Sequence, residues 1–340
     1  MYNPLARQYW SLVEGQTRLK NRYKQLIEIV FPEFNLIFND LYDDERNLNR
    51  RFEGIYFNRL HEYSELKDKA VAYSMDEIKP IMDNMVACSC GYADEAAKKT
   101  LEVSARFYKA YKEFIAENNY DALAVSCWPK FQDDYLFSVC AVVGEINDKG
   151  VVCGCEGDLT STVSQLLLSY IAEDITMLMD LSAMDETDNS IMMWHCGPAA
   201  KRFCEKKGYS YSLNYSGKDH EGRDLDHAVG TGITRDMVFD DDVYTIARLT
   251  GESNKMFLAS GVMQDGSKAS YNGSRGWLGQ LKLNRKDISA LDFFNTIMVH
   301  GFQHHFPMVK GDYTEEVMEV MAWLGLEGLE AVPYENYLQR

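Results

Sequence analysis

The middle of the chain alternates between amphipathic helical segments and short apolar runs. Apolar residues recur at helical spacing through most of residues 52–118, and most clearly over Ala96–Asn118. An apolar run typical of a buried strand follows at Ala122–Trp128, then a helical pattern over Asp134–Ile146 and a second apolar run at Val151–Cys155. Helices that alternate with short apolar strands predict βαβ units around a parallel sheet.

Beyond about Gly208 the pattern changes to strand-like runs separated by turns rich in Gly and Asp. The strand-like runs are Ala228–Thr234, Val243–Thr250 and Met256–Val262, and helical patterns at Asp287–His300 and Thr314–Leu324 close the chain. We therefore predict an α/β protein in three parts. A helical segment over residues 1–43 precedes a partial, Rossmann-like α/β domain over residues 44–172, and a β-rich α+β domain occupies residues 173–340.

Composition limits the classes of function. Apolar residues make up 46% of the 340 residues, so the chain can bury a large core. The formal net charge of −17 disfavours nucleic acid as a partner, because an acidic surface repels phosphate backbones. No apolar stretch approaches the roughly 20 residues that cross a bilayer. Met1–Trp10 lacks the basic-then-apolar layout of a signal peptide. We expect a cytoplasmic protein that does not bind membranes.

The eight cysteines are expected to be free thiols, because the chain is large and carries no export signal. Cys88 with Cys90, and Cys153 with Cys155, form two pairs separated by one residue. Structural zinc sites usually have two to four residues between paired cysteines. Small buried thiols in strands therefore explain these pairs better than a zinc site.

Polar side chains that could carry chemistry follow directly after three predicted strands. They are Glu156 after Val151–Cys155, Asp180 after Ile175–Met179, and His195 after Ile191–Trp194. In open α/β sheets ligands bind beyond the carboxyl ends of strands, so these positions favour a functional site. The alternative for each residue alone is a solvated turn residue or a buried polar group with an ordinary hydrogen bond. Asp158 is better explained as the N-cap of the helix that follows it.

A histidine pair, His304-His305, lies between a predicted helix and the apolar run Phe306–Val309. Imidazole together with two carboxylates predicts a mixed oxygen and nitrogen site for Mn²⁺ or a similar divalent cation. The alternative is a surface pair, or one histidine that is buried and hydrogen-bonded. Cys196 is not favoured as a nucleophile, because no sharp nucleophile elbow surrounds it.

Short motifs between residues 127 and 313 resemble the L-fucose/L-arabinose isomerase superfamily. They are Cys127-Trp128-Pro129, Cys155-Glu156-Gly157-Asp158, Met179-Asp180-Leu181, His195-Cys196-Gly197, His304-His305 and Gly311-Asp312-Tyr313. The resemblance runs over about Ala122–Leu326 and, more weakly, back to about Arg51. It implies a C-terminal domain of the fucose isomerase type.

The resemblance also implies roles for single residues. Glu156 and Asp180 would bind Mn²⁺ and serve as an acid/base pair, with His305 as the nitrogen ligand. Trp128, His195 and His304 would contact the sugar, although His195 matches a metal ligand of the arabinose branch. The implied reaction is an aldose–ketose isomerisation of a small sugar through an enediol, in a homo-oligomer that is a trimer or a hexamer.

The start of the chain resembles a different family. Val13–Tyr42 is similar to a helical segment of bacterial insertion-sequence transposases, without that family's catalytic acidic residues. We interpret this as a gene junction that has replaced the first domain of an isomerase, although an ordinary amphipathic helix is an alternative. The chain is then expected to be an N-terminally truncated isomerase or, alternatively, a sugar- or metal-binding remnant without catalysis.

Overall fold

The computed structural model describes residues 63–93, 95–118, 120–127, 131, 138–213, 232–250 and 255–335. The chain divides into two compact units, residues 1–60 and 61–340, and the described residues belong to the second. The predicted helical segment over residues 1–43, with its resemblance to transposases, lies outside the described residues, and so does Trp128. The boundaries predicted at residues 43 and 172 stay predictions.

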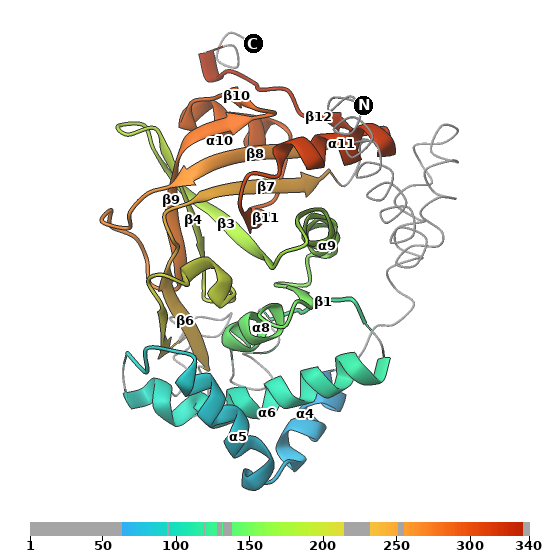
Figure 1. The fold of residues 1–340 in the computed structure, drawn as a ribbon, viewed down its shortest axis with the longest axis vertical. Coiled ribbons are helices and arrows are strands. Elements are labelled where there is room, and N and C mark those ends of the chain that lie inside the picture. Colours follow the sequence, from blue (N-terminus) through green and yellow to red (C-terminus); the bar gives the residue numbers. More distant parts are fainter. Residues whose placement is uncertain are drawn as a thin grey trace, which may run out of the picture. The chain divides into compact units, whose positions relative to one another are not determined.

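Three helices confirm the helical pattern before the first predicted strand. They are α4 (Tyr63–Ala72), α5 (Met75–Ala87) and α6 (Glu95–Asn118), which lie together in the lower part of Figure 1. The backbone N–H of Ser74 donates to the carboxylate of Glu77 at the start of α5, as in a capping box. Phe107 and Phe114 of α6 share an apolar cluster with Leu66 of α4.

A short βαβ unit follows, as the alternating pattern predicts. β1 (Ala122–Ala124) and β2 (Val152–Gly154) pair in parallel, and α8 (Cys140–Asn147) precedes β2. The side-chain amide of Asn147 bonds both the N–H and the carbonyl of Cys153, which fixes the turn into β2. α9 (Leu159–Ala172) comes next, and its predicted cap is confirmed, because the Asp158 carboxylate accepts the N–H of Ser161.

Six antiparallel strands close into a barrel, which the strand pattern did not predict. They are β3 (Thr176–Asp185), β4 (Ser190–His195), β9 (Ser274–Leu283), β8 (Lys255–Met263), β7 (Val243–Leu249) and β11 (His305–Lys310), in the order of their pairing around the ring. Closure removes the free edges that an open sheet exposes. Met179, Leu278 and Phe306 belong to one buried apolar cluster that joins these strands.

Shorter elements complete the described part of this sheet and cover it. Strands β5 (Tyr209–Leu213), β6 (Ile233–Val238), β10 (Lys286–Asp287) and β12 (Glu327–Gly328) extend the barrel sheet, and η2 (Lys201–Cys204), α10 (Ala290–Val299) and α11 (Thr314–Leu324) are helices. α9 packs against β3, β7 and β11 and separates the barrel from the small parallel sheet (Figure 1). None of the described helices is both long and apolar enough to span a bilayer. The protein is a mixture of helices and strands, as predicted.

The structure corrects three of the predicted elements. The prediction that Asp180 follows a strand is wrong, because β3 continues to Asp185 in a hairpin with β4 that places Asp180 opposite Trp194. The predicted helix Asp287–His300 begins later, at Ala290. Of the predicted strand over residues 228–234 only the last part is described, and β6 continues it to Val238.

Candidate metal centre

Five of the polar residues singled out in the sequence come together at strands β3, β4 and β11 of the barrel. Glu156 lies in the turn between β2 and α9, Asp180 in β3, His195 at the end of β4, and His304 and His305 at the start of β11. They converge because β11 and β4 both pair with β3, with His305 directly opposite Asp180. The aspartate and the histidines of the site therefore lie on or beside neighbouring antiparallel strands, and Glu156 alone follows the carboxyl end of a strand in the parallel sheet. Trp128 lies outside the described residues.

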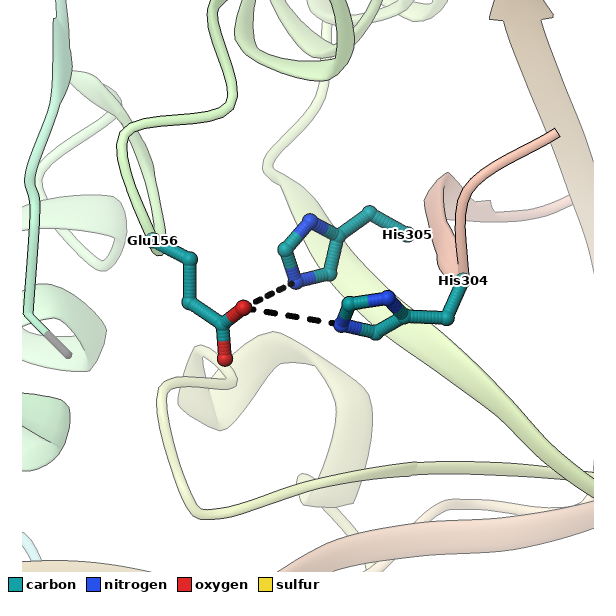
Figure 2. A group of neighbouring side chains, drawn as sticks. All are labelled: Glu156, His304 and His305. Carbon is teal, nitrogen blue, oxygen red and sulfur yellow. Dashed lines mark ion pairs between the residues drawn. The ribbon is translucent and has the colours of Figure 1, made fainter. Parts of the chain in front are cut away.

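Short distances join the five side chains. The Nε2 atom of His305 lies 3.4 Å from Oδ1 of Asp180 and 3.7 Å from Oε2 of Glu156. Figure 2 shows the Glu156 carboxylate facing both imidazole rings, and Nε2 of His304 lies 3.5 Å from Oε2 of Glu156. Nε2 of His195 lies 3.8 Å from Oδ1 of Asp180. Two groups could hold a metal ion, Glu156 with both members of the histidine pair, and Asp180 with His195 and His305.

Three buried polar atoms in this site have no hydrogen-bond partner in the described part of the chain. They are Oδ1 of Asp180, Nε2 of His195 and Nε2 of His305. A buried polar group without a partner costs about 1–3 kcal/mol, so such atoms are usually satisfied. Three within a few ångströms of one another indicate a ligand that satisfies them together. Carboxylate oxygens with one imidazole nitrogen fit Mn²⁺ and similar divalent cations.

Backbone strain marks the same place. Glu156 adopts φ 57°, the left-handed region that residues other than glycine rarely enter. Such a conformation costs of the order of 1–3 kcal/mol and is found most often at functional sites. In this conformation the Glu156 side chain faces the histidine pair (Figure 2).

The environment of His305 leaves its Nε2 lone pair directed at the site. Its Nδ1 lies 3.1 Å from Oδ2 of Asp158, a carboxylate that can only accept a hydrogen bond when charged. Burial acts to raise the pKa of Asp158, but the bonds from His305 and Ser161 hold that pKa far below its usual range. Asp158 therefore stays charged, Nδ1 of His305 carries the proton, and Nε2 is free to bind a metal.

His195 has the opposite arrangement. The backbone N–H of Cys196 donates to Nδ1 of His195 over 2.8 Å, so Nδ1 is an acceptor and the proton lies on Nε2. Burial acts to lower the pKa of His195, but the Asp180 carboxylate and Cys196 raise it to about 10. The bond from Cys196 places the proton of the neutral ring on Nε2, and a charged ring would keep that proton and lose the bond at Nδ1. His195 is therefore suited to donate a hydrogen bond into the site and unsuited to bind a metal there.

The two carboxyl groups have pKa values shifted in opposite directions. The hydrogen bond from His304 is the largest cause that lowers the pKa of Glu156, which is partly exposed. Burial is the largest cause that raises the pKa of Asp180, in spite of three nearby histidines. The surroundings therefore favour the charged form of Glu156 and disfavour the charged form of Asp180.

Sequence reasoning assigned Asp158 to helix capping alone and missed its bond to His305. It also missed Arg248 of β7, which is 4% exposed and donates to the backbone carbonyl of His305. A second nitrogen of Arg248 lies 3.4 Å from Oδ2 of Asp158. The sequence did contain a signal for Arg248. A charged residue inside an apolar strand pattern needs a buried partner of opposite charge or a hydrogen-bond acceptor.

Comparison with known proteins gives relatives but no family model that matches. The chain is 25% identical over 267 residues to a sulfoquinovose isomerase from Clostridium sp. (strain MSTE9), which is 78% of this chain and 56% of that protein. It is 27% identical over 227 residues to a sulfoquinovose isomerase from Alkalicoccus urumqiensis, which is 65% of this chain and 46% of that protein. It is 28% identical over 232 residues to a sulfoquinovose isomerase from Priestia aryabhattai, which is 67% of this chain and 48% of that protein.

The chain thus spans about half the length of the relatives it matches. These homologues are sugar isomerases, which agrees with the isomerase resemblance of the motifs. They do not bear on the resemblance of the first residues to transposases, which stays a prediction.

Proposed function

We propose that this chain carries the metal and acid/base residues of an aldose–ketose sugar isomerase. The observation that carries the proposal is the meeting of Asp180 and His305 beside the Glu156 carboxylate. Their buried Oδ1 and Nε2 atoms lie 3.4 Å apart, and neither has a hydrogen-bond partner among the described residues. The names of the relatives support the reaction class and make sulfoquinovose the first sugar to test. In this proposal the barrel is the C-terminal domain of a fucose isomerase-type fold.

Glu156, Asp180 and His305 would hold the divalent cation, with Mn²⁺ as the first candidate. A cation bound there supplies a Lewis acid that stabilises negative charge on the sugar oxygens when a proton leaves carbon. Glu156 and Asp180 would move that proton between adjacent carbons through an enediol. Their pKa values are shifted in opposite directions, as expected for one acid and one base.

The other residues of the site would position the sugar. The Nε2–H group of His195 has no hydrogen-bond partner among the described residues, so it can donate to a sugar hydroxyl or carbonyl oxygen. His304 is about half exposed and pairs with Glu156, which places it at the mouth of the site. The predicted sugar contact of Trp128 stays a prediction.

Removal of the metal tests the proposed reaction. We expect the full chain treated with EDTA to convert no aldose, and Mn²⁺ to restore conversion of sulfoquinovose or of another aldose in a panel that includes L-fucose and L-arabinose. Ketose formation would be followed by nuclear magnetic resonance. Absence of conversion across the panel, in a chain shown to hold Mn²⁺, would contradict the proposed catalysis.

A remnant that binds metal or sugar without catalysis is the second candidate. The same side chains could hold a cation in that case, because metal binding needs only the carboxylate and imidazole groups of the site. It predicts Mn²⁺ binding without conversion of any aldose. An oligomer, proposed as a trimer or hexamer from the superfamily resemblance, could supply further residues to the pocket, and light scattering of the purified chain would measure its mass.

Replacing Asp158 separates helix capping from the positioning of His305. We expect Asp158→Asn to weaken Mn²⁺ binding by about 10–100-fold, because the amide no longer holds His305 by a charged acceptor. It also lowers the free energy of unfolding by up to about 1 kcal/mol through the weakened cap. Calorimetric titration with Mn²⁺ and urea denaturation measure the two effects.

Ser161→Ala is the matched control, because Ser161 bonds the same carboxylate through its hydroxyl and its backbone N–H stays in place. This variant should lose a little stability and keep wild-type affinity for Mn²⁺. Equal affinity in Asp158→Asn and wild type would show that Asp158 only caps α9.

A further inference from the structure

A row of four free thiols adjoins the site, and the proposed isomerase reaction uses none of them. Sγ of Cys140 lies 3.0 Å from Sγ of Cys196, and Sγ of Cys127 lies 2.8 Å from Sγ of Cys155. Cys127 and Cys196 both raise the pKa of Cys155, so the two pairs are neighbours and the row runs from α8 past the end of β4 to the residues that follow β2 and β1. Cys196 and Cys155 are the direct neighbours in sequence of His195 and Glu156.

A metal bound by these thiols is not supported. Sulfurs around tetrahedral zinc lie about 3.8 Å from one another, given a Zn–S distance of about 2.3 Å. Within the described ranges, no three of the four sulfurs lie within 4.8 Å of one another, whereas the carboxylate and histidine groups of the site meet that condition. The four thiols form two close pairs in a row, an arrangement that suits a disulfide between two sulfurs better than a shared metal ion.

Access to solvent singles out one of these pairs. Cys127, Cys140 and Cys155 are 6%, 2% and 0% exposed, and Cys196 is partly exposed. The Cys196 sulfur also lies 3.2 Å from Nδ1 of His195, whose other ring nitrogen faces Asp180. Cys196 is therefore the residue of the row that a small oxidant reaches most easily, and the Cys140 sulfur lies 3.0 Å from its sulfur.

We propose that Cys196 and Cys140 form an oxidisable pair that a hydroperoxide converts into a disulfide. The sulfur of Cys196 attacks the terminal oxygen of the hydroperoxide, the O–O bond breaks, and the other oxygen leaves with the thiol proton, as water from hydrogen peroxide or as an alcohol from an organic hydroperoxide, which gives a sulfenic acid. The sulfur of Cys140 then attacks that sulfur, the S–O bond breaks, and a second water carries away the Cys140 proton. Two thiols lose two electrons, and with hydrogen peroxide the oxidant becomes two waters.

The geometry requires only a small movement. A disulfide has an S–S distance of about 2.05 Å, so the two sulfurs must approach by about 1 Å. Cys196 lies in the loop after β4, where it can move more easily than a residue inside the barrel sheet. The new bond would tie the start of α8 to the end of β4. This proposal does not depend on the isomerase reaction.

Peptide mapping tests the pair directly. The folded full chain is treated with graded hydrogen peroxide, the remaining thiols are blocked with iodoacetamide, and the protein is cut with trypsin and Glu-C. These proteases place Cys140 in residues 131–145, Cys196 in residues 187–201, Cys127 in a peptide that ends at residue 130, and Cys153 with Cys155 in residues 150–156. We expect a cross-link between peptides 131–145 and 187–201 that dithiothreitol reverses, while Cys153 stays a blocked thiol.

Two variants make the result specific. In Cys140→Ser the sulfenic acid of Cys196 should persist and react with dimedone, and no cross-link should form. Cys127→Ser is the matched control in the neighbouring pair and should leave the cross-link unchanged. A cross-link from residues 187–201 to residues 150–156 would assign the resolving thiol to Cys155 and overturn the proposal. Unmodified Cys196, at peroxide levels that oxidise the exposed Cys88 and Cys90, would overturn it as well.

Discussion

Glu156→Gln and Asp180→Asn are each expected to weaken Mn²⁺ binding by at least about 100-fold and to reduce aldose–ketose conversion by about 1,000-fold or more. Each change keeps the size of the side chain and removes its negative charge. Asp180 is 9% exposed, so its neutral amide would face His195 and His305 with no charge to offer a cation. The loss in activity exceeds the loss in binding because the same carboxylates are proposed to move the proton.

Asp185→Asn is the matched control on the same strand. Asp185 lies five residues beyond Asp180 in β3, about 16 Å away at about 3.3 Å per residue, and pairs with Lys268. Its loss should change neither Mn²⁺ affinity nor conversion. Calorimetric titration of each purified variant with Mn²⁺ gives the affinities. Wild-type affinity in both Glu156→Gln and Asp180→Asn would remove the site as described.

Arg235→Met is expected to lower the free energy of unfolding by about 3–5 kcal/mol, because it leaves two buried carboxylates without a countercharge. Arg235 of β6 is fully buried, and its guanidinium lies 2.5 Å from Glu145 and 2.8 Å from Asp148. Tyr211 donates to the same Glu145 carboxylate. This network joins α8 to strands β5 and β6, so its failure should loosen the α/β part from the barrel sheet.

Urea denaturation monitored by circular dichroism measures that loss. Lys79→Gln is the control, since it removes an exposed ion pair with Asp83 on α5 and should cost no more than about 1 kcal/mol. A loss below about 1 kcal/mol in Arg235→Met would show that the two carboxylates relax or take up protons without cost.

The same network predicts loss of stability in acid. Burial acts to raise the pKa of Glu145, but Arg235 and Tyr211 outweigh it and hold the pKa below its usual range. A carboxyl group with a lowered pKa in the folded state contributes stability that is full above its unfolded pKa. That contribution is lost as the pH falls through the folded pKa. Denaturation midpoints should therefore fall as the pH drops below about 4, and fall less in Glu145→Gln.

The local elements followed from residue patterns, whereas their assembly did not. Thr314–Leu324 is helical as predicted, because its apolar residues recur at helical spacing and Gly325 ends it in a left-handed conformation. β9 was missed, because Gly276 and Gly279 interrupt its apolar pattern. A side chain at Gly276 would have to push the Met263 side chain aside, since its Cβ would overlap the Met263 sulfur. Barrel closure depends on pairing between β8 and β9 across a bulge, which no single segment encodes.

The candidate site shows the same division. Glu156, Asp180 and His305 could be named from residue type, position and family resemblance. That Asp180 lies within a strand depended on the register of β3 against β4 and β11, which arises only when the sheet forms. The proton positions on His195 and His305 depended on Cys196 and Asp158, which sequence could not connect to the imidazole rings. These contacts separate a histidine suited to bind metal from one suited to donate a hydrogen bond.

Proton transfer by the chain loaded with Mn²⁺ is the most direct test of the central claim. The full chain, shown by titration to hold the ion, would be incubated with sulfoquinovose in deuterium oxide, and both sugars would be followed by nuclear magnetic resonance. We predict ketose formation and deuterium at the carbon next to the carbonyl, with neither signal in the metal-free chain or in Asp180→Asn. A metal-loaded wild-type chain that gives neither ketose nor deuterium exchange with any aldose of the panel would contradict the account.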